Sequence, residues 1–208
     1  MSTVGERIYS GRSPQERDDE RRQRLYRAAI ELFGTQGYAA TSVERLCAAA
    51  KVSTRHFYQL YDNKEAALLD TYATLTSTSF AEVGAALVAS EGAPIADRLA
   101  RAVRAYLEPL MADRRKSRIA FVEIVGVSPT VEVHRMEFRR TIVAMIEHEG
   151  RLAVTRGEIA DRDFHFAGMA LIGAINSVVH FWMLEPRQGS TEAFERAVVD
   201  LAVTLVLG

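Results

Sequence analysis

Cysteine is almost absent from this chain of 208 residues, which contains one, Cys47. A single cysteine cannot form an internal disulfide. Cys47 lies on an apolar helix stripe, where a buried structural thiol is favoured over a redox sensor. Hydrophobic residues make up 48% of the sequence, which is sufficient for a buried core in one large or two small domains.

Signatures of common catalytic and metal sites are also missing. The sequence contains no His-Glu-x-x-His, no Gly-x-Ser-x-Gly, no phosphate-binding glycine loop and no cysteine pair. The Glu-His-Glu at 147–149 occupies sequential positions, which point to different sides of a helix. We therefore expect no enzyme, no metal site and no cofactor.

The first 22 residues contain no apolar run, and no segment is expected to approach the length of a membrane span. We therefore expect a cytoplasmic protein that does not engage a membrane. The formal net charge is −1, but residues 1–64 hold 11 Lys and Arg against 8 Asp and Glu, whereas the remainder is net acidic. This modest basic excess is compatible with DNA binding by the N-terminal part, although it would not by itself distinguish such a protein.

Residues 22–69 carry the most informative pattern of the chain. The first apolar stripe has the i, i+3, i+4, i+7, i+8 spacing of one helix face and consists of Leu25, Ala28, Ala29, Leu32 and Phe33. Gly37 follows and is expected to end that helix. Thr41 and Glu44 have capping-box spacing, which predicts a short second helix that begins at Ser42 and is over by Lys51.

A third helix is predicted to follow Ser53, whose side chain can cap its first turn. Phe57 and Leu60 would then turn inward, and the exposed positions would be Thr54, Arg55, His56 and Gln59. Two short helices of this kind form a helix-turn-helix, in which the second helix enters the DNA major groove. Asn63 is a further cap, from which a long helix begins.

This segment resembles the DNA-binding domain of the TetR family of transcriptional regulators. The matching phrases are AAIELFGTQGY, TSVERLCAAAKVS and FYQLYDNKEAALL, in order over residues 22–69. The resemblance implies an all-helical N-terminal DNA-binding domain, and a divergent helical C-terminal domain that dimerises and usually binds a small-molecule inducer. Lys51 stands where the family commonly has Gly, which costs on the order of 1 kcal/mol in a left-handed turn. Arg55 and His56 replace residues that are often small, which bears on the operator sequence.

We predict a division of labour on the DNA-binding surface. Base edges are assigned to Thr54, Arg55 and His56, because Arg can bridge guanine O6 and N7. Phosphate contacts are assigned to Thr41, Ser42, Tyr58, Gln59 and Lys64, with an ordinary solvated side chain as the alternative for Gln59. Arg22 and Arg24 are expected near the backbone or minor groove unless they are part of a solvated face.

The expected fold is all-α, with a disordered arm over residues 1–20, a helix-turn-helix domain over 21–66, and a ligand-binding and dimerisation domain over 67–208. Helices are predicted from Leu69 toward Ala89, from Ile95 with Pro109 kinking or shortening its last turn, and over Ile119–Val125. Further helices are predicted over about Thr130–Val154, Phe164–Leu184 and Thr191–Leu207.

Phe164–Leu184 is apolar nearly all round, so it must be buried on every side. In a domain of this size we expect one face on the core and the other on a second copy of the chain, with an internal helix of a monomer as the alternative. The expected dimer contacts are Gly168, Gly173, Ser177, Phe194, Val198, Leu201 and Leu205.

Polar residues inside apolar helices are candidates for ligand recognition. Asn176 and His180 share one helix face, and each needs a partner, which could be a ligand, another side chain or a backbone carbonyl. Cavity-lining candidates are Tyr72, Tyr106, Phe121, Phe138 and Met145, all of which could equally be plain core.

The sequence thus predicts a TetR-type regulator, most plainly a repressor, that binds an inverted repeat in double-stranded DNA as a homodimer and is released by a small, mainly apolar effector. The alternative is a helical binding or carrier module in which the helix-turn-helix is a relic. A relic would not need Arg55, His56 and Gln59 on the exposed face of its third helix, so that face favours the regulator.

Overall fold

The structure is a computed structural model that describes residues 13–185 and 190–208, and all regular elements in these ranges are helices. The all-α prediction is therefore confirmed. The elements are α1 (Pro14–Thr35), α2 (Val43–Ala50), α3 (Thr54–Leu60), α4 (Lys64–Ala89), α5 (Ile95–Met111), α6 (Arg114–Arg118), η1 (Ile119–Glu123), α7 (Pro129–Thr155), α8 (Phe164–Leu184) and α9 (Thr191–Leu207).

Helix α1 begins earlier than the sequence pattern suggested. Ser13 and Glu16 form a capping box, in which Ser13 Oγ accepts the Glu16 N–H at 3.1 Å and Glu16 Oε2 accepts the Ser13 N–H at 2.5 Å. Pro14 then occupies the first turn, where its missing N–H costs nothing. The predicted disordered arm is therefore wrong for residues 14–20, which are helical, and residues 1–12 of it lie outside the described residues.

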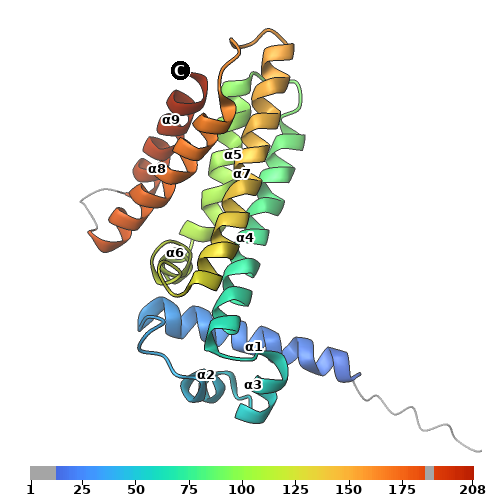
Figure 1. The fold of residues 1–208 in the computed structure, drawn as a ribbon, viewed down its shortest axis with the longest axis vertical. Coiled ribbons are helices and arrows are strands. Elements are labelled where there is room, and N and C mark those ends of the chain that lie inside the picture. Colours follow the sequence, from blue (N-terminus) through green and yellow to red (C-terminus); the bar gives the residue numbers. More distant parts are fainter. Residues whose placement is uncertain (1–12, 186–189) are drawn as a thin grey trace, which may run out of the picture.

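Helices α1, α2 and α3 pack into a small unit at one end of the molecule (Figure 1). The apolar stripe predicted for α1 is buried, and Phe33, Phe57 and Leu68 have no exposed surface. Cys47 is buried in the same core, and burial raises the pKa of its thiol, as expected for an unreactive structural cysteine.

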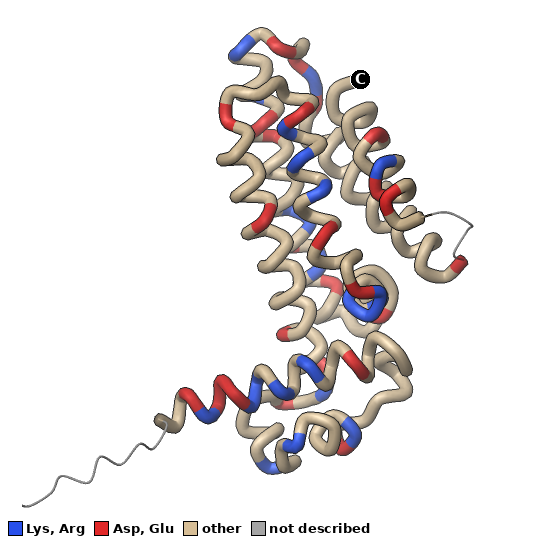
Figure 2. Tube along the Cα trace, turned by 180° about the vertical axis from the view of Figure 1, so that it is seen from behind, with Lys and Arg blue, Asp and Glu red and all other residues tan. Residues whose placement is uncertain are grey.

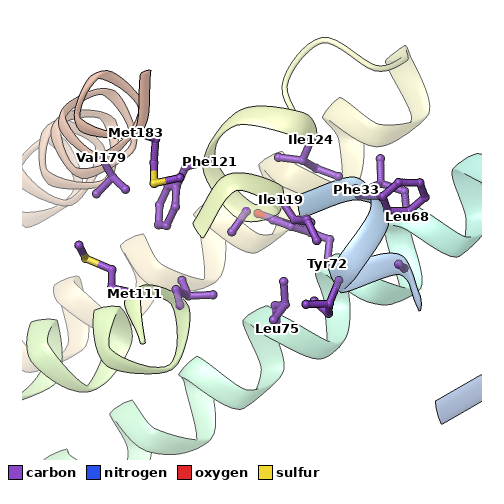
Figure 3. Packing of buried hydrophobic residues seen from close by; sticks show 14 of the residues in the cluster. Phe33, Leu68, Tyr72, Leu75, Met111, Ile119, Phe121, Ile124, Val179 and Met183 are labelled. Atoms are coloured by element: carbon purple, nitrogen blue, oxygen red, sulfur yellow. The ribbon is translucent and has the colours of Figure 1, made fainter. Parts of the chain in front are cut away.

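Helix α4 rises out of this unit and runs beside α5 and α7, while α8 and α9 pack against the other side of this bundle (Figure 1). The segment α6–η1 lies where the two parts of the molecule meet. Ile119 and Phe121 of η1 fill the space between Phe33 of α1 and Met183 of α8 (Figure 3). One apolar core is therefore continuous from the helix-turn-helix into the C-terminal bundle.

Two local predictions for this bundle need correction. Helix α5 continues through Pro109 to Met111, because a proline this close to the end removes a bond only from the last turn, so the prediction of a shortened helix is wrong and that of a kink stays a prediction. The short helix predicted over Ile119–Val125 is instead a π-helical turn, in which Ile124 N–H donates to the Ile119 carbonyl at 3.2 Å. It follows directly on α6, which the sequence pattern did not indicate.

Helix α8 is also long and apolar enough to cross a membrane by length and composition, so the statement that no segment reaches this length was wrong. In the structure 39% of its apolar window is buried within the chain, where it packs on α7 and α9. A core helix of a soluble protein passes the same test of length and composition. The contacts of α8 with α7 and α9 agree with the interpretation of α8 as a helix of the protein core.

Candidate DNA-binding surface and effector cavity

The N-terminal turn of α3 is fixed by its cap. Ser53 Oγ accepts the backbone N–H of His56 at 3.2 Å and lies 2.8 Å from Nδ1 of the same residue. This places Nδ1 against the protein, so a base edge would meet Nε2. Phe57 is fully buried beneath the helix, whereas Thr54, Arg55 and Gln59 are exposed and His56 is half-buried. The predicted reading face of α3 is thus present as a surface.

The turn that sets α3 against α2 is left-handed at Lys51, with φ 53° and ψ 44°. Val52 N–H donates to the Cys47 carbonyl at 3.0 Å, and Arg24 donates to the Lys51 carbonyl at 3.1 Å. Arg24 therefore helps to hold the turn that a non-glycine residue strains. The guanidinium of Arg22 lies 5.4 Å from the ring centre of Tyr61. Arg22 and Arg24, both predicted near DNA, therefore also contact other parts of their own domain.

Two residues assigned to phosphates have structural roles instead. Lys64 Nζ donates to the carbonyls of Tyr38 and Thr41, each at 2.8 Å, and lies 4.1 Å from the ring centre of Tyr38. Desolvation in this position lowers the pKa of Lys64. Thr41 is buried, and its hydroxyl donates to the Gly37 carbonyl at 2.8 Å. Their side chains close the loop between α1 and α2, so both phosphate assignments are corrected.

The remaining predicted contacts lie on the surface around α2 and α3. Ser42 is exposed and caps α2 by accepting the Arg45 N–H at 3.3 Å. Tyr58 is exposed, with its ring edge-on to Phe57 at 5.4 Å between centroids. The unit formed by α2, the following turn and α3 has basic positions at Arg45, Lys51 and Arg55 and an acidic one at Glu44, and both signs also occur along α1 (Figure 2). The basic excess around α3 is therefore modest.

A cavity of about 80 Å³ lies in the C-terminal bundle. Its walls come from α4, α5, α7, α8 and α9, and they include Tyr106 and Met145, as predicted. The other predicted aromatic residues, Tyr72, Phe121 and Phe138, are not among its lining residues. Phe138 contacts the rings of Phe80, Tyr72 and Tyr106, with centroids 4.6, 5.8 and 6.3 Å away, so it supports the cavity wall from behind.

Asn176 and His180 do not line the cavity either. Asn176 Nδ2 donates to the Ile172 carbonyl at 2.7 Å, one turn earlier in α8. His180 Nδ1 lies 2.7 Å from the Phe121 carbonyl, which links α8 to η1. Both therefore have backbone carbonyls as partners, and the assignment to a ligand is corrected. Sequence reasoning missed the ion pair of buried Arg98 and half-buried Glu149, which does line the cavity.

One face of α8 is apolar and uncovered by the chain. Phe166 and Phe181 are each 65% exposed, and Met169, Gly173 and Leu184 lie on the same side at helical spacing. A side chain at Gly173 would meet nothing within 4 Å, and Ser177 is exposed beside it.

Several predicted interface residues lie elsewhere in the chain's own core. Gly168 faces Val143 of α7, and a Cβ at this glycine would lie 3.3 Å from the Val143 Cα. Val198 is buried, and Phe194 stacks on Trp182 with ring centroids 4.8 Å apart. Leu201 and Leu205 are half-buried. The predicted interface is therefore corrected for Gly168 and Val198, which cannot be reached from outside.

Comparison with known families agrees with the arrangement of a helix-turn-helix on a helical bundle. Residues 25–70 match the family model described as bacterial regulatory proteins, tetR family, and residues 92–206 match the tetracyclin repressor-like C-terminal domain. This chain belongs to the TetR family. It is therefore a TetR-family transcriptional regulator.

Individual TetR-family relatives support the same fold. The HTH-type transcriptional regulator HbdR of Aromatoleum sp. (strain CIB) is 33% identical over 105 residues, which cover 50% of this chain and 44% of HbdR. The chain thus matches less than half the length of that relative. The fatty acid degradation regulator FadR of Bacillus halodurans superposes with a TM-score of 0.79 at 16% identity, covering 93% of this chain and 97% of FadR. FadR from Bacillus subtilis in complex with stearoyl-CoA gives 0.78 at 18% identity, with coverages of 88% and 97%.

In this TetR-family chain the C-terminal end of α1 is tied to the bundle through polar contacts. Glu123 accepts the backbone N–H of Tyr38 at 2.7 Å and the Arg118 Nε–H at 2.8 Å. Arg118 also donates to the Thr35 carbonyl at 2.8 Å. Gly34 permits the close approach of α1 and α6, because a Cβ there would overlap Arg115. We call Glu123, Arg118 and the α1 end at Thr35–Tyr38 the interdomain joint.

Proposed function

We propose that this regulator is a cytoplasmic repressor that binds an inverted-repeat operator in double-stranded DNA as a homodimer and leaves it when a small, mainly apolar effector binds. It has no catalytic activity in this account. Domain limits of 21–66 for DNA binding and 67–208 for effector binding and dimerisation are part of the proposal, with α1 extending the first domain toward the N-terminus.

The observation that carries DNA binding is the capped, exposed turn of α3. Arg55 can bond guanine O6 and N7, Thr54 and His56 Nε2 can reach neighbouring base edges, and Ser42, Tyr58 and Gln59 flank them toward the phosphates. Arg22 and Arg24 remain proposed backbone contacts besides their bracing roles. A carrier module with a relic helix-turn-helix would not need these exposed side chains.

Dimerisation is proposed through the uncovered face of α8, with Gly173 at its centre. An apolar stripe that the chain leaves open can be covered by the same stripe of a second copy across a two-fold axis, in an isologous interface. Ser177 and the half-buried α9 residues Phe194, Leu201 and Leu205 would lie within or beside it. One reading helix spans few base pairs, so two linked copies are needed for specific binding.

Induction is proposed to start in the cavity and to act through α4 and the interdomain joint. The cavity wall includes α4, which continues directly into the helix-turn-helix, and η1 carries Glu123 against α1. An effector that favours one arrangement of this bundle would change the spacing of two reading helices in the dimer. It can weaken DNA binding only by its differential affinity, typically about 1–3 kcal/mol, and DNA must weaken effector binding equally.

The experiment is a gel shift with the DNA immediately upstream of the protein's own coding sequence. We expect a discrete complex that excess random DNA does not displace, and we expect Arg55→Ala to weaken it by about 1–3 kcal/mol with relaxed preference at one base position. Equal binding to specific and random DNA by both proteins would refute the assignment of the reading face. Absence of any complex with upstream DNA would favour the carrier module.

A further inference from the structure

The chemistry of the cavity wall restricts what can occupy it. Polar side chains along the described part of the wall come from Arg98, Tyr106 and Glu149, and the other lining residues are aliphatic, aromatic, methionine or glycine. Two of these three polar residues are already paired with each other. The third is not, so the wall has one charge-neutral pair and one separate hydroxyl.

Arg98 and Glu149 form a closed pair. Arg98 Nε and Nη2 donate to Glu149 Oε2 at 3.1 and 2.5 Å, and Arg98 Nη1 donates to the carbonyls of Leu87 and Ser90 at 3.2 and 3.0 Å. The pair joins the end of α4 to α5 and α7, and its charges cancel. A ligand carboxylate would have to displace Glu149, and an ammonium group would have to compete with Arg98 for it. Either exchange leaves a charge poorly solvated, which is costly in an apolar site.

Tyr106 is in the opposite situation. Its side chain is buried, yet its hydroxyl makes no hydrogen bond to any described residue. Every fully buried side-chain nitrogen or oxygen in the described part of the chain has a partner, so this hydroxyl must retain some accessible surface. Tyr106 lines the cavity, so its hydroxyl is the polar group of the wall that an occupant could bind without breaking the Arg98–Glu149 pair. Burial raises the pKa of Tyr106, so the phenol stays protonated at neutral pH and can donate.

We propose that the effector is an uncharged compound with an apolar chain and a carbonyl group, such as an ester, thioester or ketone, whose oxygen accepts a hydrogen bond from Tyr106. The proposal deepens the proposed function and rests on the cavity being the effector site. The apolar chain of the effector lies among Leu, Ile and Val side chains of α4, α5 and α8. Arg98 and Glu149 stay paired with each other and bind no ionised group of the effector.

The test uses the full chain and three probes of similar length, methyl octanoate, octanoate and octylamine, titrated calorimetrically without DNA. Wild type should bind the ester at least about tenfold more tightly than either ion, since burying an unpaired charge is costly. Tyr106→Phe should weaken ester binding about 2- to 12-fold, the range for one neutral hydrogen bond. Tyr72→Phe is the matched control, because Tyr72 is equally buried and contacts Phe138 but does not line the cavity. Its ester affinity should equal that of wild type.

Tighter binding of octanoate or octylamine than of the ester would overturn the proposal, and so would ester binding that Tyr106→Phe leaves unchanged or failure of wild type to bind any probe. The comparison of the affinities for the ester and for the two ions uses wild type alone, so it tests the proposal even if Tyr106→Phe does not fold. DNA binding is scored separately by gel shift. Ester binding without DNA binding would refute the repressor and keep this proposal, whereas the reverse would refute this proposal alone.

Discussion

The Glu123 carboxylate, in the C-terminal bundle, accepts the backbone N–H of Tyr38, in the helix-turn-helix part, at 2.7 Å. The two residues are 85 positions apart in the chain. The other oxygen of Glu123 binds Arg118, which in turn holds the Thr35 carbonyl, so one carboxylate fixes the end of α1 from two sides. Within the interdomain joint, the bond from Tyr38 to Glu123 is the shortest hydrogen bond between the helix-turn-helix part and the bundle that holds the cavity.

Glu123→Gln should loosen this joint without changing its shape. Hydrogen bonds to a charged acceptor are stronger than neutral ones by about 1 kcal/mol, so the free energy of urea unfolding should fall by about that amount. Hydrogen exchange at the Tyr38 amide should accelerate about fivefold. Glu82→Gln, at an exposed position of α4, is the control and should change neither. Unchanged exchange at Tyr38 would show that this contact does not hold the joint.

Lys64→Met tests the corrected role of Lys64. Loss of two hydrogen bonds from a charged donor to the carbonyls of Tyr38 and Thr41 should destabilise the protein by about 1–3 kcal/mol. The slope of log DNA affinity against log salt should stay as in wild type, because no phosphate contact is lost. Lys51→Met, at an exposed position in the same unit, should alter stability by less than about 0.5 kcal/mol. A salt slope reduced by about one in Lys64→Met would restore the phosphate assignment.

Tyr72 predicts a specific loss of stability at alkaline pH. Burial raises the pKa of Tyr72 from 10.0 to about 12. Between these values the unfolded chain releases the phenolic proton and the folded chain keeps it, so folding stability falls as pH rises through 10, by up to about 1.4 kcal/mol per pH unit. Urea unfolding at pH 9 and pH 11 should therefore show a larger loss for wild type than for Tyr72→Phe. Equal losses would contradict the burial of this phenol.

Gly173→Glu tests the α8 interface. The site is open in the single chain, so the substitution should leave the fold intact, while a charge in an apolar two-fold contact costs several kcal/mol and should give monomers. Gly84→Glu is the matched control, since a side chain at Gly84 in α4 also meets nothing within 4 Å. Sedimentation equilibrium on wild type and both variants provides the measurement. A Gly173→Glu protein that stayed dimeric would remove this face from the interface.

The helices were accessible to sequence reasoning because their signals are local. Ser53 and Asn63 cap α3 and α4 where their side chains predicted, and α8 and α9 have the predicted limits Phe164–Leu184 and Thr191–Leu207. Each boundary depends on a cap or a break within a few residues of it.

The site was less accessible because its contacts are long-range. Arg98 meets Glu149 across 51 positions, and no spacing rule joins residues on two separate helices. Lys64 was assigned to DNA because exposed lysines near a reading helix bind phosphates, yet two nearby carbonyls without helix partners hold it inward. Asn176 and His180 share a face of α8 as predicted, but backbone carbonyls of Ile172 and Phe121 satisfy them.

The central claim, a dimer that reads an inverted repeat with α3, is tested most directly by hydroxyl-radical footprinting of the upstream DNA, with wild type and Gly173→Glu side by side. Wild type should protect two patches related by inverted sequence, with centres about 34–36 Å or a multiple of that apart along the helix axis. Gly173→Glu should lose both patches at the same protein concentration, because one reading helix alone binds too weakly. A single protected patch for wild type, or two patches that persist in a monomeric Gly173→Glu protein, would contradict the account.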